Sequence, residues 1–397
     1  MQELVLLPKE EFELRLSRVQ AKMRDAGMDA MLVTDNANKY YLAGRVYAGF
    51  AFVLAEGAPV WLVRRPVELG GEGVMYYRRP DELPELVKAA GVQGYASLGL
   101  EYDISPYSQI MKMRQIFFEA VPALGFANLN QLMRDARAVK TPHEVGQMVL
   151  SGLRHEQVYR RIPGLFRVGM TDLELQVEIE RLSRLEGCLG VFRISGQSME
   201  LFMGNILAGK NADVPTPYDF AMGGAGLDPS LPVGASGEEI KEHTTVMVDL
   251  NGDYTGYMTD MTRVFTLGSV PQLAVDAHQC SIDICRMFER EALPGVEAKA
   301  LYAMIEDMVK ERGLERWFMG HRQHAGFVGH GLGIEINELP VIAPRSRAML
   351  EENNMIALEP KFVIPDVGAV GIENTYHITS AGAVSITNAP EELIPLL

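Results

Sequence analysis

The sequence is poor in cysteine and contains no cysteine pair of the CxxC type. Its three cysteines among 397 residues are Cys188, Cys280 and Cys285. An odd number without the regular spacing of a disulfide framework or a zinc site indicates reduced thiols. We therefore expect a protein of a reducing compartment, the cytoplasm.

Long apolar stretches and an excess of positive charge are missing as well. No stretch reaches the roughly 18 apolar residues that a membrane-spanning helix needs. The first residues, MQELVLLPKEEFELRL, do not combine a basic segment with an uninterrupted apolar run, so no signal peptide is predicted. The formal net charge is -15, whereas a nucleic-acid partner requires a basic surface. These absences argue against nucleic-acid and membrane partners.

Histidine is missing from the start of the chain, because all eight histidines lie at or beyond position 143. Histidine is the commonest metal ligand and titrates near neutral pH. A chain of 397 residues is too long for one ordinary core, so two domains are expected. We predict a first domain over about 1–135 and a second over 140–397, with the boundary near RAVKTPHEVGQM. Any chemistry is assigned to the second domain.

The periodicity of apolar residues differs between the two domains. The first alternates helices and strands, which predicts an α/β domain with a largely covered sheet. The second contains long helical patterns and strand-like stretches that cluster late. This predicts an α+β domain in which helices pack on one face of a curved antiparallel sheet. The expected helices of the second domain are 143–162, 171–186, 270–291 and 297–313, and the expected strands are 244–250, 261–268, 355–364 and 369–379.

Two acidic residues lie in one apolar hairpin, TTVMVDLNGDYTGYMTDMTRVF. Asp249 ends one strand and Asp260 begins the next. A turn centred on Tyr254–Thr255 would place the two carboxylates opposite each other, whereas a turn at Asn251–Gly252 would keep them apart. Because Gly256 favours a longer, bulged loop, we predict the first register.

A second acidic pair lies in MIALEPKFVIPDVGAVGIENTYHI. A turn around Pro365–Gly368 would place Glu359 opposite Glu373 on adjacent strands. Like charges this close raise each other's pKa unless a cation lies between them. Four carboxylates and one histidine, His330, suit two divalent ions such as manganese, cobalt or zinc.

Each of these residues also has an ordinary structural interpretation. Asp249 and Asp260 could cap a hairpin, and Glu359 could end a surface strand. Glu373 could pair with a lysine or arginine, and His330, between two glycines, could be a structural histidine. Spacing alone does not connect the five residues.

Several longer segments resemble one known family. VMVDLNGDYTGYMTDMTRVFTLG, GHGLGIEINELP and ALEPKFVIPDVGAVGIEN follow the order of motifs in the creatinase/prolidase/aminopeptidase P family, the pita-bread metallopeptidases of family M24. NANKYYLAG and RDARAVKTPHEVGQM resemble that family's amino-terminal domain and linker. The resemblance covers nearly the whole chain and implies a creatinase-type α/β domain followed by a pita-bread α+β domain.

The resemblance implies the roles of the five residues. Asp260 and Glu373 would bridge two divalent metal ions, Asp249 would hold one ion, and His330 and Glu359 the other. The ions would lower the pKa of a shared water and polarise the scissile carbonyl. Glu359 is the expected catalytic proton shuttle.

Four further residues are expected to support the cluster or to contact substrate: Thr262, Asn337, Glu338 and His324. Thr262 follows Asp260 by two positions and therefore lies on the same strand face. The resemblance also implies a homodimer.

The chain departs from the family at several positions. Proline-specific members usually carry histidine where this chain has Asn337 and Gly326, and a third near Pro232. They often carry arginine where this chain has Gly371. His324 could replace one histidine after a local change of backbone path. Asparagine forms hydrogen bonds but cannot move protons.

Three functions are therefore open. The first is a dinuclear metal-dependent hydrolase of Xaa-Pro peptides, of the aminopeptidase P or prolidase type. The second is an enzyme of the same fold that hydrolyses a C–N bond of a small molecule or eliminates a leaving group. The third is a catalytically silent binding protein, which would have no chemical need for clustered acids.

Overall fold

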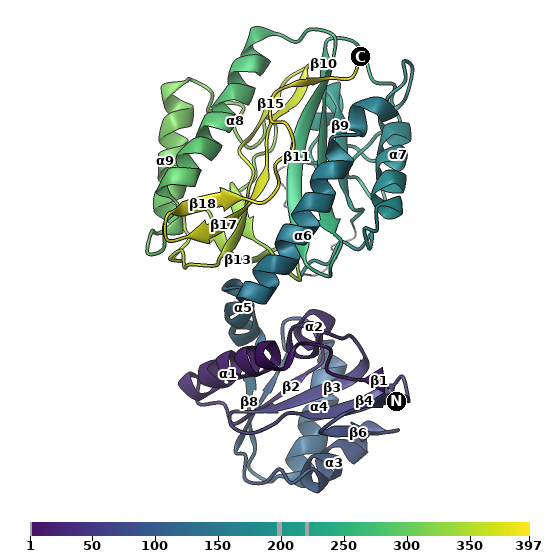
Figure 1. The fold of residues 1–397 in the computed structure, drawn as a ribbon, viewed down its shortest axis with the longest axis vertical. Coiled ribbons are helices and arrows are strands. Elements are labelled where there is room, and N and C mark those ends of the chain that lie inside the picture. Colours follow the sequence, from purple (N-terminus) through teal and green to yellow (C-terminus); the bar gives the residue numbers. More distant parts are fainter. Residues whose placement is uncertain (1, 197–200, 219–221) are drawn as a thin grey trace. The chain divides into compact units, whose positions relative to one another are not determined.

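The computed structural model describes residues 2–196, 201–218 and 222–397, and Figure 1 shows their fold. The chain divides into two compact units, Met1–Arg137 and Ala138–Leu397. Among the described residues, no helix combines the length and the apolar character needed to cross a membrane.

The first unit is built on a six-stranded mixed sheet with the strand order β6-β4-β3-β2-β7-β8. Helix α2 begins at an aspartate cap, since the Asp35 carboxylate accepts hydrogen bonds from the backbone of Ala37 and Asn38. The strands are β1 (Gln2–Glu3), β2 (Ala30–Val33), β3 (Ala48–Leu54), β4 (Val60–Arg65), β5 (Leu69–Gly70), β6 (Val74–Tyr76), β7 (Ser97–Leu100) and β8 (Gly125–Asn128). The helices are α1 (Lys9–Asp25), α2 (Asn36–Ala43), α3 (Leu83–Ala89), α4 (Tyr107–Ala120) and α5 (Asn130–Ala138), with a short 3-10 turn at Pro80–Glu82. The predicted α/β character is confirmed.

A buried carboxylate joins two elements of this unit. Glu101, at the end of β7, accepts hydrogen bonds from the backbone of Thr34 and Asp35 and from the Asn38 amide, at 2.7–2.8 Å. Burial raises the pKa of Glu101 to about 7, although these hydrogen bonds oppose the shift. The folded unit therefore holds a proton that the unfolded chain releases.

The stability of the first unit should consequently fall as the pH rises from about 4.5 to about 7, by up to about 3 kcal/mol. Glu101→Gln should flatten this slope, because an amide does not titrate. The hydrogen-bond network can be kept, since the unpartnered oxygen of Asn38 can accept from the new amide after a flip. Unfolding can be followed by the fluorescence of Trp61 in a Trp317→Phe background, since the chain has only these two tryptophans. An unchanged slope in the variant would contradict the assignment to Glu101.

The second unit contains a four-stranded sheet, β19-β11-β10-β9, a five-stranded sheet, β13-β12-β14-β17-β18, and the hairpin β15-β16. Helices α6 and α7 pack against the first sheet, and α8 and α9 pack against strands of the second sheet and the hairpin (Figure 1). The helices are α6 (Pro142–Tyr159), α7 (Asp172–Leu185), α8 (Gln272–Glu291) and α9 (Ala298–Glu311), with 3-10 turns at Ile162–Leu165 and Gly209–Asp213. The strands are β9 (Gly204–Ala208), β10 (Thr244–Asp253), β11 (Met258–Leu267), β12 (Gly329–Gly331), β13 (Glu338–Ile342), β14 (Met355–Leu358), β15 (Lys361–Ile364), β16 (Gly368–Gly371), β17 (Asn374–Thr379), β18 (Gly382–Ser385) and β19 (Ile394–Pro395). The predicted α+β class is confirmed.

The predicted register of the first hairpin is wrong. Asp249 pairs with Thr262, and Asp260 pairs with Asn251, so the aspartates are diagonal rather than opposite. β10 runs on to Asp253 and β11 already begins at Met258, so the turn is shorter than predicted and its centre lies between Thr255 and Gly256. The Asp253 carboxylate accepts a hydrogen bond from the backbone of Gly256 in this turn. Since directly paired residues and residues two apart share a face, both aspartates still point to the same side.

The predicted register of the second hairpin is confirmed. Leu358 pairs with Asn374, and Lys361 pairs with Gly371. Glu359 and Glu373 lie between these two ladders in the same register. An isolated bridge between Thr262 and Glu373 then joins the hairpin of β10 and β11 to this region.

Candidate metal centre

The five residues of the predicted ligand set lie together in the second unit. They form two groups of possible ligands, Asp260 with His330 and Glu373, and Asp249 with Glu359 and Glu373. Within each group the ligand atoms all lie within 4.8 Å of one another. All five residues line one cavity of about 340 Å³.

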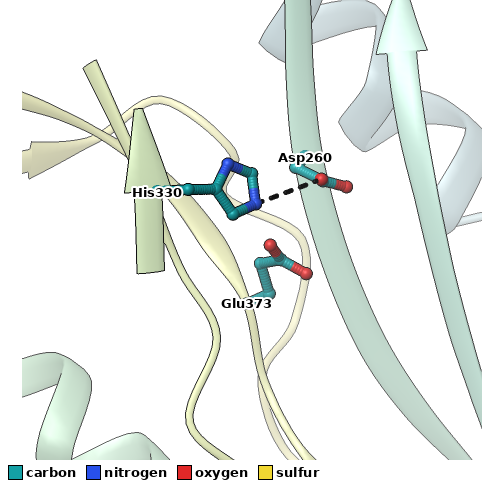
Figure 2. Close-up of side chains that lie close together, drawn as sticks. All are labelled: Asp260, His330 and Glu373. Atoms are coloured by element: carbon teal, nitrogen blue, oxygen red, sulfur yellow. Dashed lines mark ion pairs between the residues drawn. The ribbon is translucent and has the colours of Figure 1, made fainter. Parts of the chain in front are cut away.

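In the first group, a histidine nitrogen is directed at carboxylates (Figure 2). His330 Nδ1 lies 3.1 Å from the carbonyl oxygen of Gly331 and donates to it, because a carbonyl can only accept. Nε2 lies 4.0 Å from Asp260 Oδ2 and 3.6 Å from Glu359 Oε1. Burial lowers the pKa of His330 and so favours the neutral ring. A neutral ring held this way presents a lone pair to the carboxylates, which suits a cation between them.

Glu373 completes this group. Its Oε2 accepts a hydrogen bond of 2.8 Å from the Thr262 hydroxyl. Its Oε1 is buried and has no hydrogen-bond partner. A buried carboxylate oxygen without a partner is costly unless a cation completes it. Asp260, His330 and Glu373 therefore fit a divalent ion.

The second group already contains a cation, which sequence reasoning missed. Lys361 is fully buried, and its Nζ lies 2.8 Å from Asp249, 2.8 Å from Glu359 and 3.0 Å from Glu373. The signal was present in the motif ALEPKFVI, where a lysine follows Glu359 by two positions and thus shares its strand face. The suggestion that Glu373 could pair with a lysine is confirmed, and it holds for two further carboxylates.

The titration of the cluster reflects its crowding. Burial and the charges of Glu373 and Asp249 raise the pKa of Asp260 well above its usual range. Burial also raises the pKa of Glu359, and it raises that of Glu373 to about 8 against the opposing charge of Lys361. Burial disfavours the charged lysine, but the three carboxylates raise its pKa well above the usual value. One ammonium therefore does not compensate four carboxylates, and without a further cation the cluster favours retained protons.

The other predicted site residues are placed differently. Asn337 lines the cavity, and its amide exchanges two hydrogen bonds with the backbone of Ser195. Glu338 is buried and pairs with Lys140 at 2.9 Å, and it is not among the described residues that line this cavity. The exposed His324 donates to the carbonyl of Phe318.

Family members often carry histidine or arginine at the positions of Gly326, Gly371 and Pro232. These positions differ in the space available for a larger side chain. A side chain at Gly326 would meet open space, so a histidine would fit there. At Gly371, φ is +122° and a Cβ would lie 2.5 Å from the carbonyl oxygen of Pro360, which excludes an arginine. The carbonyl of Pro232 accepts a hydrogen bond from the Thr216 hydroxyl.

The remaining cavity wall is mainly apolar. It includes Phe192, Ile194, Phe202, Phe327, Ile336 and Val341. Among the described lining residues there is no lysine or arginine. The residues outside the described ranges contribute none either, because 197–200 read QSME and 219–221 read DFA.

Comparison with known proteins identifies the family of this chain. Residues 147–380 match metallopeptidase family M24, and residues 15–139 match the creatinase/prolidase N-terminal domain. The chain belongs to metallopeptidase family M24. The resemblance inferred from the motifs is thereby confirmed, and divalent metal ions are implied by membership of the family.

Relatives of this M24 chain extend over nearly its full length. It is 24% identical to an Xaa-Pro dipeptidase of Pyrococcus horikoshii, over 96% of this chain and 98% of the relative. It is 28% identical to a probable dipeptidase PepE of Mycobacterium bovis, over 97% and 96%. The prolidase structure from Pyrococcus horikoshii OT3 matches with a TM-score of 0.77 at 22% identity, covering 96% of this chain and all of that chain. The X-Pro aminopeptidase of Thermotoga maritima MSB8 matches with a TM-score of 0.76 at 19% identity, covering 96% and 99%.

Proposed function

We propose that this chain is a metal-dependent peptidase that cleaves the peptide bond before proline. The observation that carries the proposal is the convergence of Asp260, His330 and Glu373 on one cavity, with an unpartnered oxygen on Glu373 and an oriented nitrogen on His330. The relatives, an Xaa-Pro dipeptidase and an X-Pro aminopeptidase among them, support the substrate class.

The residues of the site would have different roles in catalysis. Asp260, His330 and Glu373 would hold a divalent ion, which would supply Lewis acidity and lower the pKa of a bound water. Glu359 is held by Lys361 through Oε2, whereas its Oε1 lies on the side of His330. Oε1 is therefore the atom that would take a proton from the attacking water and pass it to the leaving amine. The Thr262 hydroxyl keeps the Glu373 carboxylate in position.

The electrostatics of the cavity support a longer peptide over a dipeptide. In an Xaa-Pro dipeptide the proline carries a free carboxylate. No lysine or arginine among the described lining residues could pair with this carboxylate. The amino-terminal ammonium, which a dipeptide and a longer peptide share, would meet Asp249, whose side chain is 23% exposed, so the carboxylate alone separates the two substrates. The apolar wall favours an apolar residue before the proline.

The ion would be manganese, cobalt or zinc, since the proposed ligands combine imidazole with carboxylates. The three cysteines are buried and unpaired, which suits the reducing cytoplasm proposed for the protein. The homodimer implied by the resemblance stays a prediction.

The test is turnover of Xaa-Pro-Xaa peptides and Xaa-Pro dipeptides by protein loaded with manganese, cobalt or zinc. We expect turnover, with the longer peptides preferred. Glu359→Gln should lower kcat by about 10² to 10⁴ fold with little change of metal content, because the amide keeps its contact with Lys361 but cannot accept the proton. Equal turnover in the variant would place the activity outside this site.

The replaced residues favour a second candidate, a small-molecule enzyme of the same fold. Asn337 is engaged with the Ser195 backbone and cannot move a proton. Metal-loaded, folded protein that cleaves no Xaa-Pro peptide would make this candidate the leading one. Non-peptide amides, guanidino compounds and lyase substrates would then be assayed. Protein that binds no metal would favour the binding-protein alternative.

A further inference from the structure

We propose that the ammonium of Lys361 replaces one of the two divalent ions, so that the centre of this chain holds a single ion beside Asp260, His330 and Glu373. The inference rests on the proposed metal-dependent function and deepens it, because it assigns the number of ions and the residue that sets this number.

The hydrogen bonds of Lys361 carry the inference. An ammonium has three donors, and Nζ uses them on three carboxylates, those of Asp249, Glu359 and Glu373, at 2.8–3.0 Å. These are the same three residues that form the second group of possible metal ligands. An ion bound to that group would need metal–oxygen distances of about 2.0–2.2 Å and would compete with Nζ for the same oxygens.

The backbone keeps the lysine in this place. Lys361 lies on β15 opposite Gly371, which has no side chain to fill the space between the strands. Its carbonyl accepts a hydrogen bond of 2.8 Å from the backbone of Met319. The side chain is fully buried and is not among the residues that line the cavity. Nζ therefore reaches the carboxylates from inside the protein and leaves the cavity side to the ion.

The charges of the cluster agree with one ion. Asp249, Asp260, Glu359 and Glu373 carry four negative charges when ionised. Two divalent ions and the ammonium would bring five positive charges, whereas one ion and the ammonium bring three. The remaining negative charge can be matched by the amino-terminal ammonium of a peptide, so one ion leaves the site complementary to the proposed substrate.

The number of bound ions tests the inference directly. Wild-type protein is stripped with a chelator, incubated with excess Mn²⁺ and desalted, and its manganese is measured by mass spectrometry. We expect about one ion per chain in the wild type and about two in Lys361→Ala, where the second group is released. Lys241→Ala removes a lysine that is 67% exposed and should stay at about one ion.

A second measurement needs no variant and covers the case in which Lys361→Ala does not fold. Electron paramagnetic resonance of the wild-type Mn²⁺ protein should give the hyperfine pattern of isolated ions. Two ions per wild-type chain with an exchange-coupled spectrum would overturn the inference and leave the proposed function intact. Wild-type protein that binds no ion would overturn the proposed function, and the inference with it.

Discussion

Glu373→Gln should abolish peptidase activity while leaving the metal-free protein at least as stable as the wild type. The amide keeps the shape of the side chain and can still accept from Thr262 and Lys361. It removes a charged ligand from the centre, so kcat/KM should fall by at least about 10³ fold. It also removes one of four crowded carboxylates, so the folded state loses like-charge repulsion.

The pH dependence separates the two effects. Burial and the neighbouring carboxylates raise the pKa of Glu373 to about 8. In metal-free wild-type protein, the folded state therefore holds a proton that the unfolded chain has already released, so stability falls as the pH rises from about 4.5 to about 8 and levels off above that pH. Glu373→Gln has no proton to release, so the difference between its free energy of unfolding and that of the wild type should grow in favour of the variant up to about pH 8 and stay constant above it. Chemical unfolding at pH 6 and pH 9, with chelator present, measures the difference.

A matched variant at another buried glutamate should lose stability but keep metal binding. Glu338 pairs with Lys140, and both side chains are at most 2% exposed. Glu338→Gln leaves the lysine charge buried without its counter-ion, which should cost about 3 kcal/mol of stability. Metal binding should persist in the folded protein. Wild-type turnover in Glu373→Gln would contradict the proposed role of Glu373 as a ligand, and the same pH dependence of stability in the variant and the wild type would contradict the proposed charge crowding.

The sequence predicted one hairpin correctly and the other incorrectly for a physical reason. The turn between Ile364 and Gly368 is short and begins with Pro365, and Gly368 follows it directly, so its centre is well defined. The turn after Asp253 has several residues that could occupy its centre, and the register depends on a side-chain hydrogen bond to Gly256. The prediction that Asp249 and Asp260 lie on the same face is still correct, because the predicted and observed registers differ by an even number of residues.

The contacts of Lys361 could not be obtained from strand periodicity. Periodicity places the lysine on the face of Glu359, but it does not bring Asp249 to the same point. That contact depends on the bridge between Thr262 and Glu373, which joins strands far apart in the sequence. Residue type and spacing thus predicted the candidate ligands, whereas the compensating cation required the tertiary structure.

Arg263→Met should destabilise the second unit by about 4 kcal/mol. Arg263 is fully buried, and its guanidinium donates to the carbonyl oxygens of Thr262, Glu373, Thr387 and Ala389 and to the Asn374 side chain. Methionine has similar length but no donors, so these acceptors would be left buried without partners. Denaturant unfolding followed by Trp317 in a Trp61→Phe background would measure the loss.

The same variant should also weaken metal binding in the protein that stays folded. Arg263 bonds the backbone of both Thr262 and Glu373, and it thereby fixes the bridge that aligns the Glu373 carboxylate. We expect the metal affinity to fall by about 10 to 100 fold, the range found when supports of a ligand are removed. Arg181→Met is the control. Arg181 is 59% exposed, and among the ion pairs of the described residues it pairs only with Glu178. This variant should therefore change stability by less than about 0.5 kcal/mol. If Arg263→Met were destabilised but bound metal with wild-type affinity, the arginine would act on the fold alone, and the alignment of Glu373 would have to depend on the Thr262 hydroxyl and Lys361.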